Sequence, residues 1–293
     1  MRIFYGIETN NNDVTNICNT LLIKNNIITI PAGDTKRAYH FTDNNIGILK
    51  YVFIEIDGKI TKYSEIFELQ INTITEEIIT IVDDIDYKIK TIHNKYKLSY
   101  GSFNEELPEQ KMAIKYLKGH EKVLEIGGNI GRNSIVIADI LKTNNFVSLE
   151  CDVDIATQLK YNRDNNMLKF FVEEAALSNR KLIQKGWDTI PSDKLLPGYK
   201  SVNTITWNEL NNKYNITFDT LVLDCEGAFY YILQDMPEVL ENIKLIIMEN
   251  DYHNIEHKIY VDNVLKNKGF DVIYSEAGGW GPCYNNFFEV WSL

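Results

Sequence analysis

Short apolar runs of strand length dominate the first part of the chain. Residues 26–30, 49–56, 65–71 and 78–82 are rich in β-branched and aromatic side chains, which favour strands. Asp57-Gly58, directly after the second run, is typical of a tight hairpin turn. We therefore expect a small β-rich domain over residues 1–100. It serves either as a folded accessory, for example as the surface of a homodimer, or as a determinant of substrate specificity.

The pattern changes near residue 100. Residues 104–117 have helical spacing, with acidic residues in the first turn and lysines further along. Beyond them, apolar strands at 123–127, 146–150, 170–177, 220–224 and 245–249 alternate with helices at 133–141, 154–163, 229–240 and 254–268. Near-continuous apolar strands that alternate with helices are typical of a doubly wound parallel sheet. We place this α/β domain at residues 101–293.

Two features refine the expected sheet. A segment that carries Gly186, Pro191 and Pro197 precedes the fourth strand, and we expect it to be a loop. The last two apolar runs, 270–274 and 287–291, are too close for a crossover helix, so we expect them to be antiparallel. The domain is thus predicted to close with a C-terminal antiparallel hairpin.

The composition of the chain limits which partners the protein can bind and which cellular compartment it occupies. With 293 residues, 44% of them hydrophobic, the chain is long enough for two domains with buried cores. The formal net charge of -11 argues against nucleic acid as a partner, because its binding depends on Lys and Arg. No run approaches the roughly 20 apolar residues of a membrane span, and the opening segment is too short and too polar for a signal peptide. We expect a cytoplasmic protein that does not attach to membranes.

The cysteines fit the same compartment. Cys18, Cys151, Cys225 and Cys283 lie far apart and form no C-x-x-C pair. This pattern favours reduced thiols over a disulfide framework or a zinc site.

Residues 122–133, KVLEIGGNIGRN, form the most informative stretch of the sequence. A short strand that contains an acid opens into a glycine-bearing turn, but the dinucleotide pattern G-x-G-x-x-G does not fit its spacing. The carboxylate would repel a pyrophosphate and suits the sulfonium and ammonium groups of S-adenosyl-L-methionine. We therefore predict this cofactor, bound by Glu125, Gly127, Asn129, Gly131 and Asn133. A nicotinamide cofactor, and a turn that binds nothing, remain as alternatives.

The ends of the next two strands extend the predicted cofactor site, because ligands of open α/β sheets bind beyond the carboxyl ends of the strands. The second strand ends at Glu150-Cys151, where the acid can accept hydrogen bonds from both ribose hydroxyls. The same spacing also suits nicotinamide enzymes. Glu174 and Ala175 follow the third strand, and we expect them to border the adenine.

Several segments resemble the FkbM family of S-adenosylmethionine-dependent methyltransferases, over about residues 105–293. The matching segments are Val123-Leu-Glu125-Ile-Gly127-Gly-Asn129-Ile-Gly131, Ser148-Leu-Glu150-Cys151, Ala176-Leu-Ser178-Asn179, Val222-Leu-Asp224-Cys-Glu226-Gly227-Ala228 and Met248-Glu249. Glu125, Gly128 and Cys151 depart from the family pattern, which has Asp, Ala and Pro there. The resemblance implies the Rossmann-like fold of class I methyltransferases. It also implies O-methylation of a hydroxyl on a sugar, a glycan precursor or a related small molecule.

The later strand ends carry the residues predicted for catalysis. A hydroxyl is a weak nucleophile at neutral pH, so a base or a metal ion must help to remove its proton. We assign Asp224 to the methionine part of the cofactor or to the acceptor, Glu226 to the base or a metal ligand, and His253 to an alternative base. A divalent metal is compatible with this chemistry, but no ligand set indicates one. Glu249 and Trp280 are candidates for acceptor binding, Trp280 by stacking on a sugar face.

Simpler interpretations stand beside these assignments. Asp224 could cap the following helix, Glu226 could pair with a lysine, and Trp280 could pack beneath the hairpin. His253-Asn-Ile-Glu256-His257 matches the H-x-x-E-H zinc pattern, but little chain follows to supply a third ligand, which favours a solvated helix face. For the whole protein, the second hypothesis is a non-catalytic S-adenosylmethionine-binding or scaffold protein.

Overall fold

The computed structural model describes residues 1–43, 45, 47–82 and 84–293 and divides the chain into two compact units, Met1–Lys90 and Thr91–Leu293. The division falls inside helix α3 (Asp84–Lys95). It lies ahead of residue 100, where the sequence pattern changes. The second unit therefore begins with the last turn of α3.

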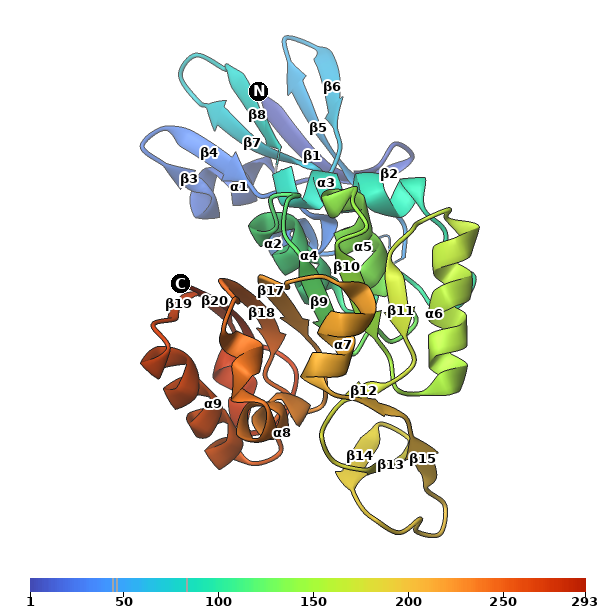
Figure 1. Cartoon of the computed structure of the whole chain (residues 1–293). Coiled ribbons are helices and arrows are strands. Elements are labelled where there is room, and N and C mark those ends of the chain that lie inside the picture. The colour runs from blue at the N-terminus through green and yellow to red at the C-terminus, as the bar shows by residue number, and fades with distance from the viewer. Residues whose placement is uncertain (44, 46, 83) are drawn as a thin grey trace. The chain divides into compact units, whose positions relative to one another are not determined.

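Antiparallel sheets and short helices make up the first unit (Figure 1). One sheet has the order β2 (Asn10–Asp13), β1 (Arg2–Ile7), β5 (Tyr51–Ile56), β6 (Lys59–Tyr63). The other has the order β3 (Ile23–Lys24), β4 (Ile27–Ile30), β7 (Phe67–Asn72), β8 (Ile78–Val82). Helices α1 (Thr15–Leu21) and α2 (Asp34–Phe41) belong to the same unit. Its core contains the fully buried Ile3, Ile28, Val52 and Leu69.

The strands predicted in this unit are confirmed as β4, β5, β7 and β8. Asp57 and Gly58 have φ angles of 49° and 78°, the left-handed conformation that a tight hairpin turn requires, and they join β5 to β6. The pattern missed helix α2, because Arg37 takes a buried position that an apolar residue would mark. The guanidinium of Arg37 donates to the carbonyl oxygens of Pro31 and Phe67 over 2.9 and 2.6 Å.

The second unit is built on a mixed sheet with the strand order β11-β10-β9-β17-β18-β20-β19 (Figure 1). Its strands are β9 (Val123–Ile126), β10 (Phe146–Leu149), β11 (Phe171–Glu173), β17 (Thr220–Leu223), β18 (Leu245–Glu249), β19 (Asp271–Glu276) and β20 (Phe288–Ser292). The first five strands in the order are parallel, and β20 is antiparallel to both of its neighbours. This is the strand order of the class I methyltransferase fold, so the predicted fold class is confirmed.

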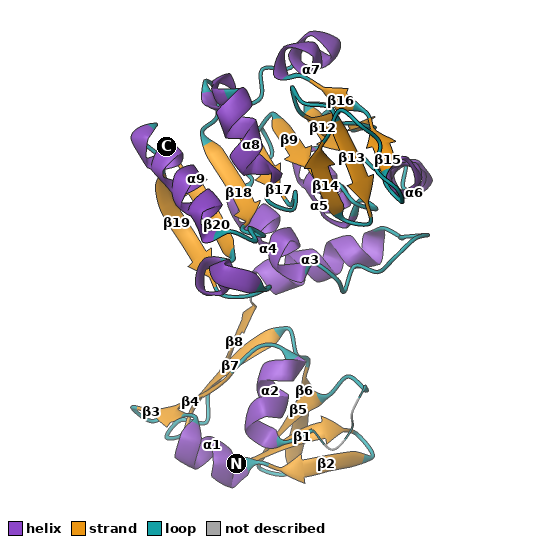
Figure 2. Ribbon diagram, turned by 90° about the horizontal axis from the view of Figure 1, so that it is seen from below, coloured by secondary structure: helices purple, strands orange, loops and turns teal. Residues whose placement is uncertain are grey.

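Helices lie on both faces of this sheet (Figure 2). They are α4 (Leu107–Tyr116), α5 (Arg132–Leu141), α6 (Val153–Asn165), α7 (Trp207–Tyr214), α8 (Ala228–Asp235) and α9 (Ile255–Asn267). Helix α4 packs against α5 and β18, and α8 packs against α9. None of the helices in the described part of the chain is long and apolar enough to cross a membrane.

The register of the central strands decides where the site forms. Strands β9, β10 and β17 are mostly apolar and entirely buried. Ile126 is paired with Leu149 on one side and with Leu223 on the other, and Leu223 is paired with Met248. These strands therefore end at one level, and the residues that follow them share one edge of the sheet.

The prediction of a loop before the fourth strand is wrong. Residues 182–202 form a separate antiparallel sheet of β13 (Leu182–Lys185), β14 (Asp188–Pro191) and β15 (Lys200–Val202), in which Gly186, with a φ of 60°, makes the turn between two strands. The predicted strand 170–177 is divided into β11 and β12 (Ala176–Leu177), and β12 pairs with β16 (Thr204–Ile205) instead of the main sheet. Helix α7 was also missed, although Thr206 and Glu209 form a capping box that signals its start.

The C-terminal hairpin is confirmed. Strands β19 and β20 are antiparallel, and β18 is antiparallel to β20 as well. Strand β19 therefore runs in the same direction as β18. Its end points toward the edge that carries the other strand ends, as the predicted role of Trp280 in acceptor binding requires.

Candidate functional site

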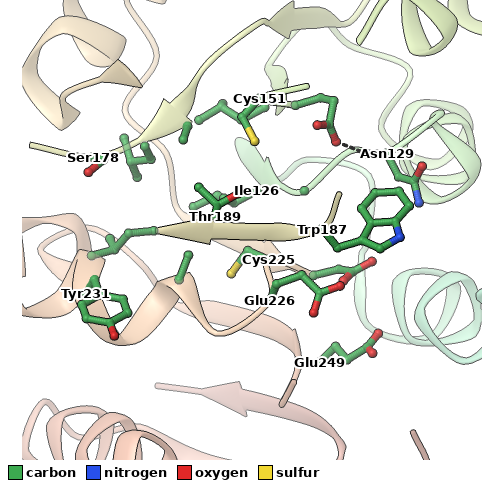
Figure 3. Close-up of a pocket in the computed structure, with 18 of the residues that line it drawn as sticks. Ile126, Asn129, Cys151, Ser178, Trp187, Thr189, Cys225, Glu226, Tyr231 and Glu249 are labelled. Atoms are coloured by element: carbon green, nitrogen blue, oxygen red, sulfur yellow. Dashed lines mark hydrogen bonds between the residues drawn. The ribbon is translucent and has the colours of Figure 1, made fainter. Parts of the chain in front are cut away.

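A cavity of about 1000 Å³ lies at the carboxyl ends of the parallel strands. Gly127, Glu150, Asp224 and Glu249, the residues that end or follow β9, β10, β17 and β18, all line it. The β13–β14 hairpin contributes further lining residues, among them Gln184, Trp187 and Thr189. Figure 3 shows this hairpin passing across the cavity, with Trp187 near Asn129 and Glu226 in the view. The cavity therefore occupies the place where open α/β sheets bind their ligands.

The turn after β9 requires glycine at Gly127. Its φ is 92°, and a Cβ atom at this position would lie only 1.6 Å from the carbonyl oxygen of Asp224. The neighbouring turns of β9 and β17 thus meet in direct backbone contact. A ligand laid over this point can approach the backbone closely.

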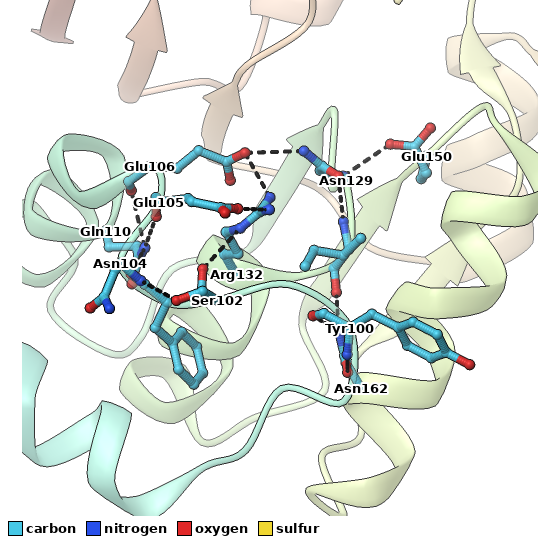
Figure 4. Close-up of polar contacts among 12 residues, drawn as sticks. Tyr100, Ser102, Asn104, Glu105, Glu106, Gln110, Asn129, Arg132, Glu150 and Asn162 are labelled. Carbon is cyan, nitrogen blue, oxygen red and sulfur yellow. Dashed lines mark hydrogen bonds and ion pairs between the residues drawn. The ribbon is translucent and has the colours of Figure 1, made fainter. Parts of the chain in front are cut away.

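Asn129 ties this turn to its surroundings. It has a left-handed φ of 46°, and its backbone N–H donates to Oε2 of Glu150 over 2.9 Å. Its side-chain amide donates to Oε1 of Glu106 over 3.0 Å, and Arg132 donates to the same oxygen over 2.8 Å (Figure 4). The turn is therefore held by carboxylates on both sides before any ligand binds.

The segment that precedes α4 is fastened to the same turn (Figure 4). Arg132 donates from Nε to the carbonyl oxygen of Ser102 over 3.1 Å. Asn162 donates to the carbonyl oxygen of Ile130 over 2.9 Å and accepts from the backbone N–H of Ser99 over 2.8 Å. These bonds fix the segment that brings Glu106 to the cavity.

Glu150 is a buried acid in the part of the cavity that is lined by the predicted cofactor residues. It is 7% exposed, and its two carboxylate oxygens accept from the backbone N–H groups of Asn129 and Asp152 over 2.9 and 2.8 Å. Burial raises the pKa of Glu150 although these bonds oppose the shift. Its neighbour Cys151 also lines the cavity, and burial raises the pKa of that thiol to about 11, so Cys151 is an uncharged surface there.

Some predicted cofactor residues lie outside the cavity lining: Glu125, Gly131, Asn133 and Glu174. Glu125 is 2% exposed and accepts hydrogen bonds from the hydroxyl groups of Ser134 and Ser148. Burial raises its pKa to about 7. Glu125 supports the strand from within the sheet, because alternation along β9 turns Ile126, and not Glu125, to the cavity.

Gly131, Asn133 and Glu174 were also predicted to bind the cofactor, but each contacts other parts of the protein instead of the cavity. Gly131 precedes α5 with a φ of 94°, and a Cβ atom there would lie 2.6 Å from Leu159. Asn133 lies in α5, and its Oδ1 is buried without a hydrogen-bond partner among the described residues. Glu174 forms an ion pair with Lys160, whereas the adjacent Ala175 does line the cavity.

The far end of the cavity is acidic. Glu109 is 7% exposed, and its carboxyl faces that of Glu249 within hydrogen-bonding reach. Burial, and then the hydrogen bond with Glu109, raise the pKa of Glu249 to about 11. Burial and the charges of nearby carboxylates, Asp251 first among them, also raise the pKa of Asp224. This end of the cavity therefore retains protons at neutral pH.

Glu226 lies in a strained turn that a buried acid holds in place. Its φ is 50°, and the backbone N–H of the next residue, Gly227, donates to Oδ1 of Asp251 over 2.7 Å. Burial raises the pKa of Glu226, and the charge of His253 lowers it. In the described part of the chain no lysine or arginine pairs with Glu226. Helix α8 has Gly227 at its N-cap position with no side-chain cap, so Asp224 does not cap this helix.

His253 lines the cavity beside Glu226, and the ring of Trp280 lies against it with 4.5 Å between the ring centroids. Trp280 itself is 40% exposed and lies just outside the lining, whereas Gly279 lines it. His257, the second histidine of the H-x-x-E-H motif, stacks instead on Tyr230 at 3.7 Å. Among the described residues no group of His, Cys, Asp and Glu is arranged to hold a metal ion.

Glu106, Glu109 and Trp187 also line the cavity, although the sequence pattern did not indicate them. The two glutamates looked like ordinary acids of a helical first turn, which stabilise a helix without any ligand. Trp187 was hidden in the segment expected to be a loop. An exposed tryptophan next to Gly186 is the signal that could have identified it, because a hairpin tip can carry an aromatic side chain over a cavity.

No protein-family model matches the chain, and the search of curated proteins found no match. A protein of the NADB-Rossmann superfamily from Streptococcus agalactiae is 13% identical, with 63% of this chain and 67% of that chain covered and a TM-score of 0.41. A putative O-methyltransferase from Klebsiella pneumoniae is 14% identical, with 71% and 89% covered and a TM-score of 0.40. A putative tRNA (m1A22) methyltransferase from Streptococcus pneumoniae, in complex with S-adenosyl-L-methionine, is 13% identical, with 62% and 71% covered and a TM-score of 0.39. The fold assignment rests on the strand order of this chain.

Proposed function

We propose that this protein is an S-adenosylmethionine-dependent methyltransferase that acts on a hydroxyl of a sugar, a glycan precursor or a related small molecule. The observation that carries the proposal is the convergence of Gly127, Glu150 and Asp224 at one edge of the sheet. The glycine allows close approach of a ligand to the backbone, and the buried carboxylate of Glu150 can accept hydrogen bonds from ribose hydroxyls.

The lining residues fit the parts of this cofactor. Ala175 and Leu177 offer small and apolar surface for an adenine, and Cys151 adds an uncharged thiol beside Glu150. The turn at Gly127 and Asn129 is the place for the methionine part, next to Asp224. The bound cofactor supplies an electrophilic methyl group on a sulfonium. The protein has to hold an acceptor oxygen in line with that methyl and remove its proton.

Glu226 and His253 are the residues that we propose for proton removal. Both line the cavity, and they lie close enough for the histidine to shift the pKa of the carboxyl. Asp251 holds the turn of Glu226 through the N–H of Gly227, so the backbone that carries the carboxyl has a defined position. Trp280 packs against His253 and offers an exposed face to a sugar ring.

A hydroxyl acceptor is supported by this base and by the FkbM-like segments at the strand ends. A nucleic-acid acceptor is not, because the chain has a net charge of -11 and the acceptor end of the cavity is lined by carboxyls. A non-catalytic cofactor-binding protein would keep the cofactor residues but would have no need of a positioned base beside them.

The test has two stages. Thermal unfolding with S-adenosyl-L-methionine or with NAD measures which cofactor stabilises the folded protein, and we expect a shift with S-adenosyl-L-methionine alone. Labelled S-adenosyl-L-methionine is then incubated with free glycans, nucleotide-sugars and related small hydroxyl compounds, and we expect label in at least one of them. Cofactor binding without transfer to any acceptor would favour the scaffold hypothesis, and a shift with NAD alone would contradict the proposal.

A further inference from the structure

The end of the cavity formed by α4, β17 and β18 carries an excess of carboxyl groups. Glu106 and Glu109 reach it from the start of α4, Asp224 and Glu226 follow β17, and Glu249 ends β18. Of the described residues that line the cavity, Arg180 alone carries a guanidinium or ammonium, and it pairs with Asp235. Arg132, which lies outside the lining, pairs with Glu106. In the described part of the chain no lysine or arginine pairs with the other four carboxyls.

The pair of Glu109 and Glu249 stands out within this group. The two side chains line the same cavity from α4 and β18, which pack against each other, and Oε2 of Glu109 is buried without a hydrogen-bond partner in the described part of the chain. Two carboxyls that share a site cannot both ionise without a counter-charge. One shared proton can hold them together in the free protein. An ammonium group of a ligand, which donates several hydrogen bonds, can replace that proton and satisfy both carboxylates.

Trp187 supplies the second element of an ammonium site. It lies at the tip of the β13–β14 hairpin, lines the cavity and is 59% exposed. Figure 3 shows its ring at the same end of the cavity as Glu226 and Glu249. An aromatic face attracts an ammonium through its quadrupole. Carboxylates and an aromatic ring that line the same end of a cavity therefore suit an organic cation.

The pair is separate from the residues that we propose for the cofactor. Strand β17 lies between β18, which ends in Glu249, and β9, whose end carries the turn at Gly127. Glu106, the acid nearest to that turn, is already bonded to Asn129 and Arg132. A metal ion is a poorer occupant than an amine, since no metal-holding group was found among the described residues.

We propose that Glu109 and Glu249 bind the protonated amine of the acceptor under the ring of Trp187, so that the methylated compound is an amino alcohol such as an amino sugar. The inference rests on the proposed function, which supplies the methyl transfer to the neighbouring hydroxyl. The amine itself stays protonated and serves as the recognition group. The hydroxyl proton passes to the base, Glu226 or His253, as the new C–O bond forms and the methyl–sulfur bond breaks.

The test uses the full chain saturated with S-adenosylhomocysteine, whose own ammonium fills the cofactor site. Calorimetric titration compares matched amine and hydroxyl probes: ethanolamine with ethylene glycol, and D-glucosamine with D-glucose. We expect at least one amine to bind about tenfold or more tightly than its hydroxyl partner, as a desolvated charged hydrogen bond implies. Equal binding, or no binding, of every amine relative to its partner would overturn the proposal.

Variants locate the site. Glu109→Gln and Glu249→Gln preserve shape, and the amide of either can donate to the remaining carboxyl, so the fold is expected to persist. Each should weaken amine binding about tenfold or more while S-adenosylhomocysteine affinity stays unchanged. Trp187→Leu, at an exposed hairpin tip, should weaken it about three- to tenfold. Glu241→Gln, an exposed acid outside the cavity, is the matched control. Unchanged amine binding in Glu109→Gln and Glu249→Gln contradicts the site.

The outcomes separate the two proposals. If S-adenosylhomocysteine does not bind the wild-type chain, the proposed function fails, and the same amine titration is carried out on the unloaded chain. Amine binding that still depends on Glu109 and Glu249 would then support the ammonium site by itself.

Discussion

Gly127 and Asp224 both line the cavity, and there the turn after β9 touches the backbone that follows β17. The carbonyl oxygen of Asp224 occupies the space that a Cβ atom on Gly127 would need, at a separation of 1.6 Å. Main chain, rather than side chains, thus forms the floor of the proposed cofactor site. This contact links the stability of the fold to ligand binding, because one substitution disturbs both.

We expect Gly127→Ala to lower both stability and cofactor affinity. The methyl group collides with the carbonyl of Asp224, and the φ of 92° is unfavourable for alanine. The free energy of unfolding should fall by about 3 kcal/mol, from strain together with overpacking. Gly58→Ala is the control, because Gly58 also has a positive φ, 78°, but no atom lies within 4 Å of its added Cβ. That variant should lose only about 1 kcal/mol. Similar losses in the two variants, measured by urea unfolding, would contradict a steric role for Gly127.

Glu150→Gln should weaken cofactor binding with little effect on the rest of the fold. An amide cannot accept from the ribose hydroxyls and from the N–H groups of Asn129 and Asp152 at once. Loss of a charged hydrogen bond predicts a rise in the dissociation constant of S-adenosylhomocysteine of about 10- to 100-fold. Calorimetric titration measures it, with Glu241→Gln as the control. An unchanged constant would remove Glu150 from the cofactor site.

Glu226→Gln should reduce turnover by about 10²- to 10⁴-fold once an acceptor is known, because the hydroxyl proton loses its base. Affinity for S-adenosyl-L-methionine should not change. His253→Gln is the companion variant that distinguishes the two candidate bases. Full turnover in Glu226→Gln combined with a large loss in His253→Gln would transfer the role to the histidine.

The stability of the protein should fall as pH rises through the titration of Glu125. Burial raises the pKa of this carboxyl from 4.5 to about 7 in the folded state. Below pH 4.5, the pKa of the unfolded state, Glu125 is protonated in both the folded and the unfolded protein. It therefore does not lower the free energy of unfolding there. As the pH rises from 4.5 to 7, the unfolded state releases its proton first, so the free energy of unfolding falls, by about 3 kcal/mol in total. Above pH 7 the loss is constant.

Glu125→Gln provides the measurement of this effect. The amide oxygen can still accept from Ser134 and Ser148, but the side chain carries no charge. The stability of the variant relative to wild type should therefore increase between pH 5 and pH 8 in urea unfolding, whereas Glu241→Gln should show a flat difference. A flat difference for Glu125→Gln as well would show that this carboxyl does not titrate in that range.

Much of the second unit could be predicted because its elements carry their own signals. Strands such as β9 and β17 are buried on both faces, so they appear as mostly apolar runs, and the helices between them have regular spacing. The turn at Gly127 could also be recognised, because its glycines follow the strand directly in the sequence. The structure shows that Gly127 is needed where this backbone passes close to that of Asp224. The hairpin sheet from β13 to β15 carried no such signal: its strands are short and half-exposed, and its turn residues looked like those of a loop.

The fold class, the order of the strand ends and the acids that follow them can all be recognised from the amino-acid sequence. Which of those acids reach the cavity depends on how the elements pack in three dimensions. Glu125 and Ile126 are adjacent in the chain, yet the pleat of β9 sends the acid into the interior and the isoleucine to the cavity. Glu109 and Glu249 are distant in the chain, yet the packing of α4 on β18 brings both into the lining of one cavity. Contacts of this kind depend on packing between elements, which no local pattern of residues encodes.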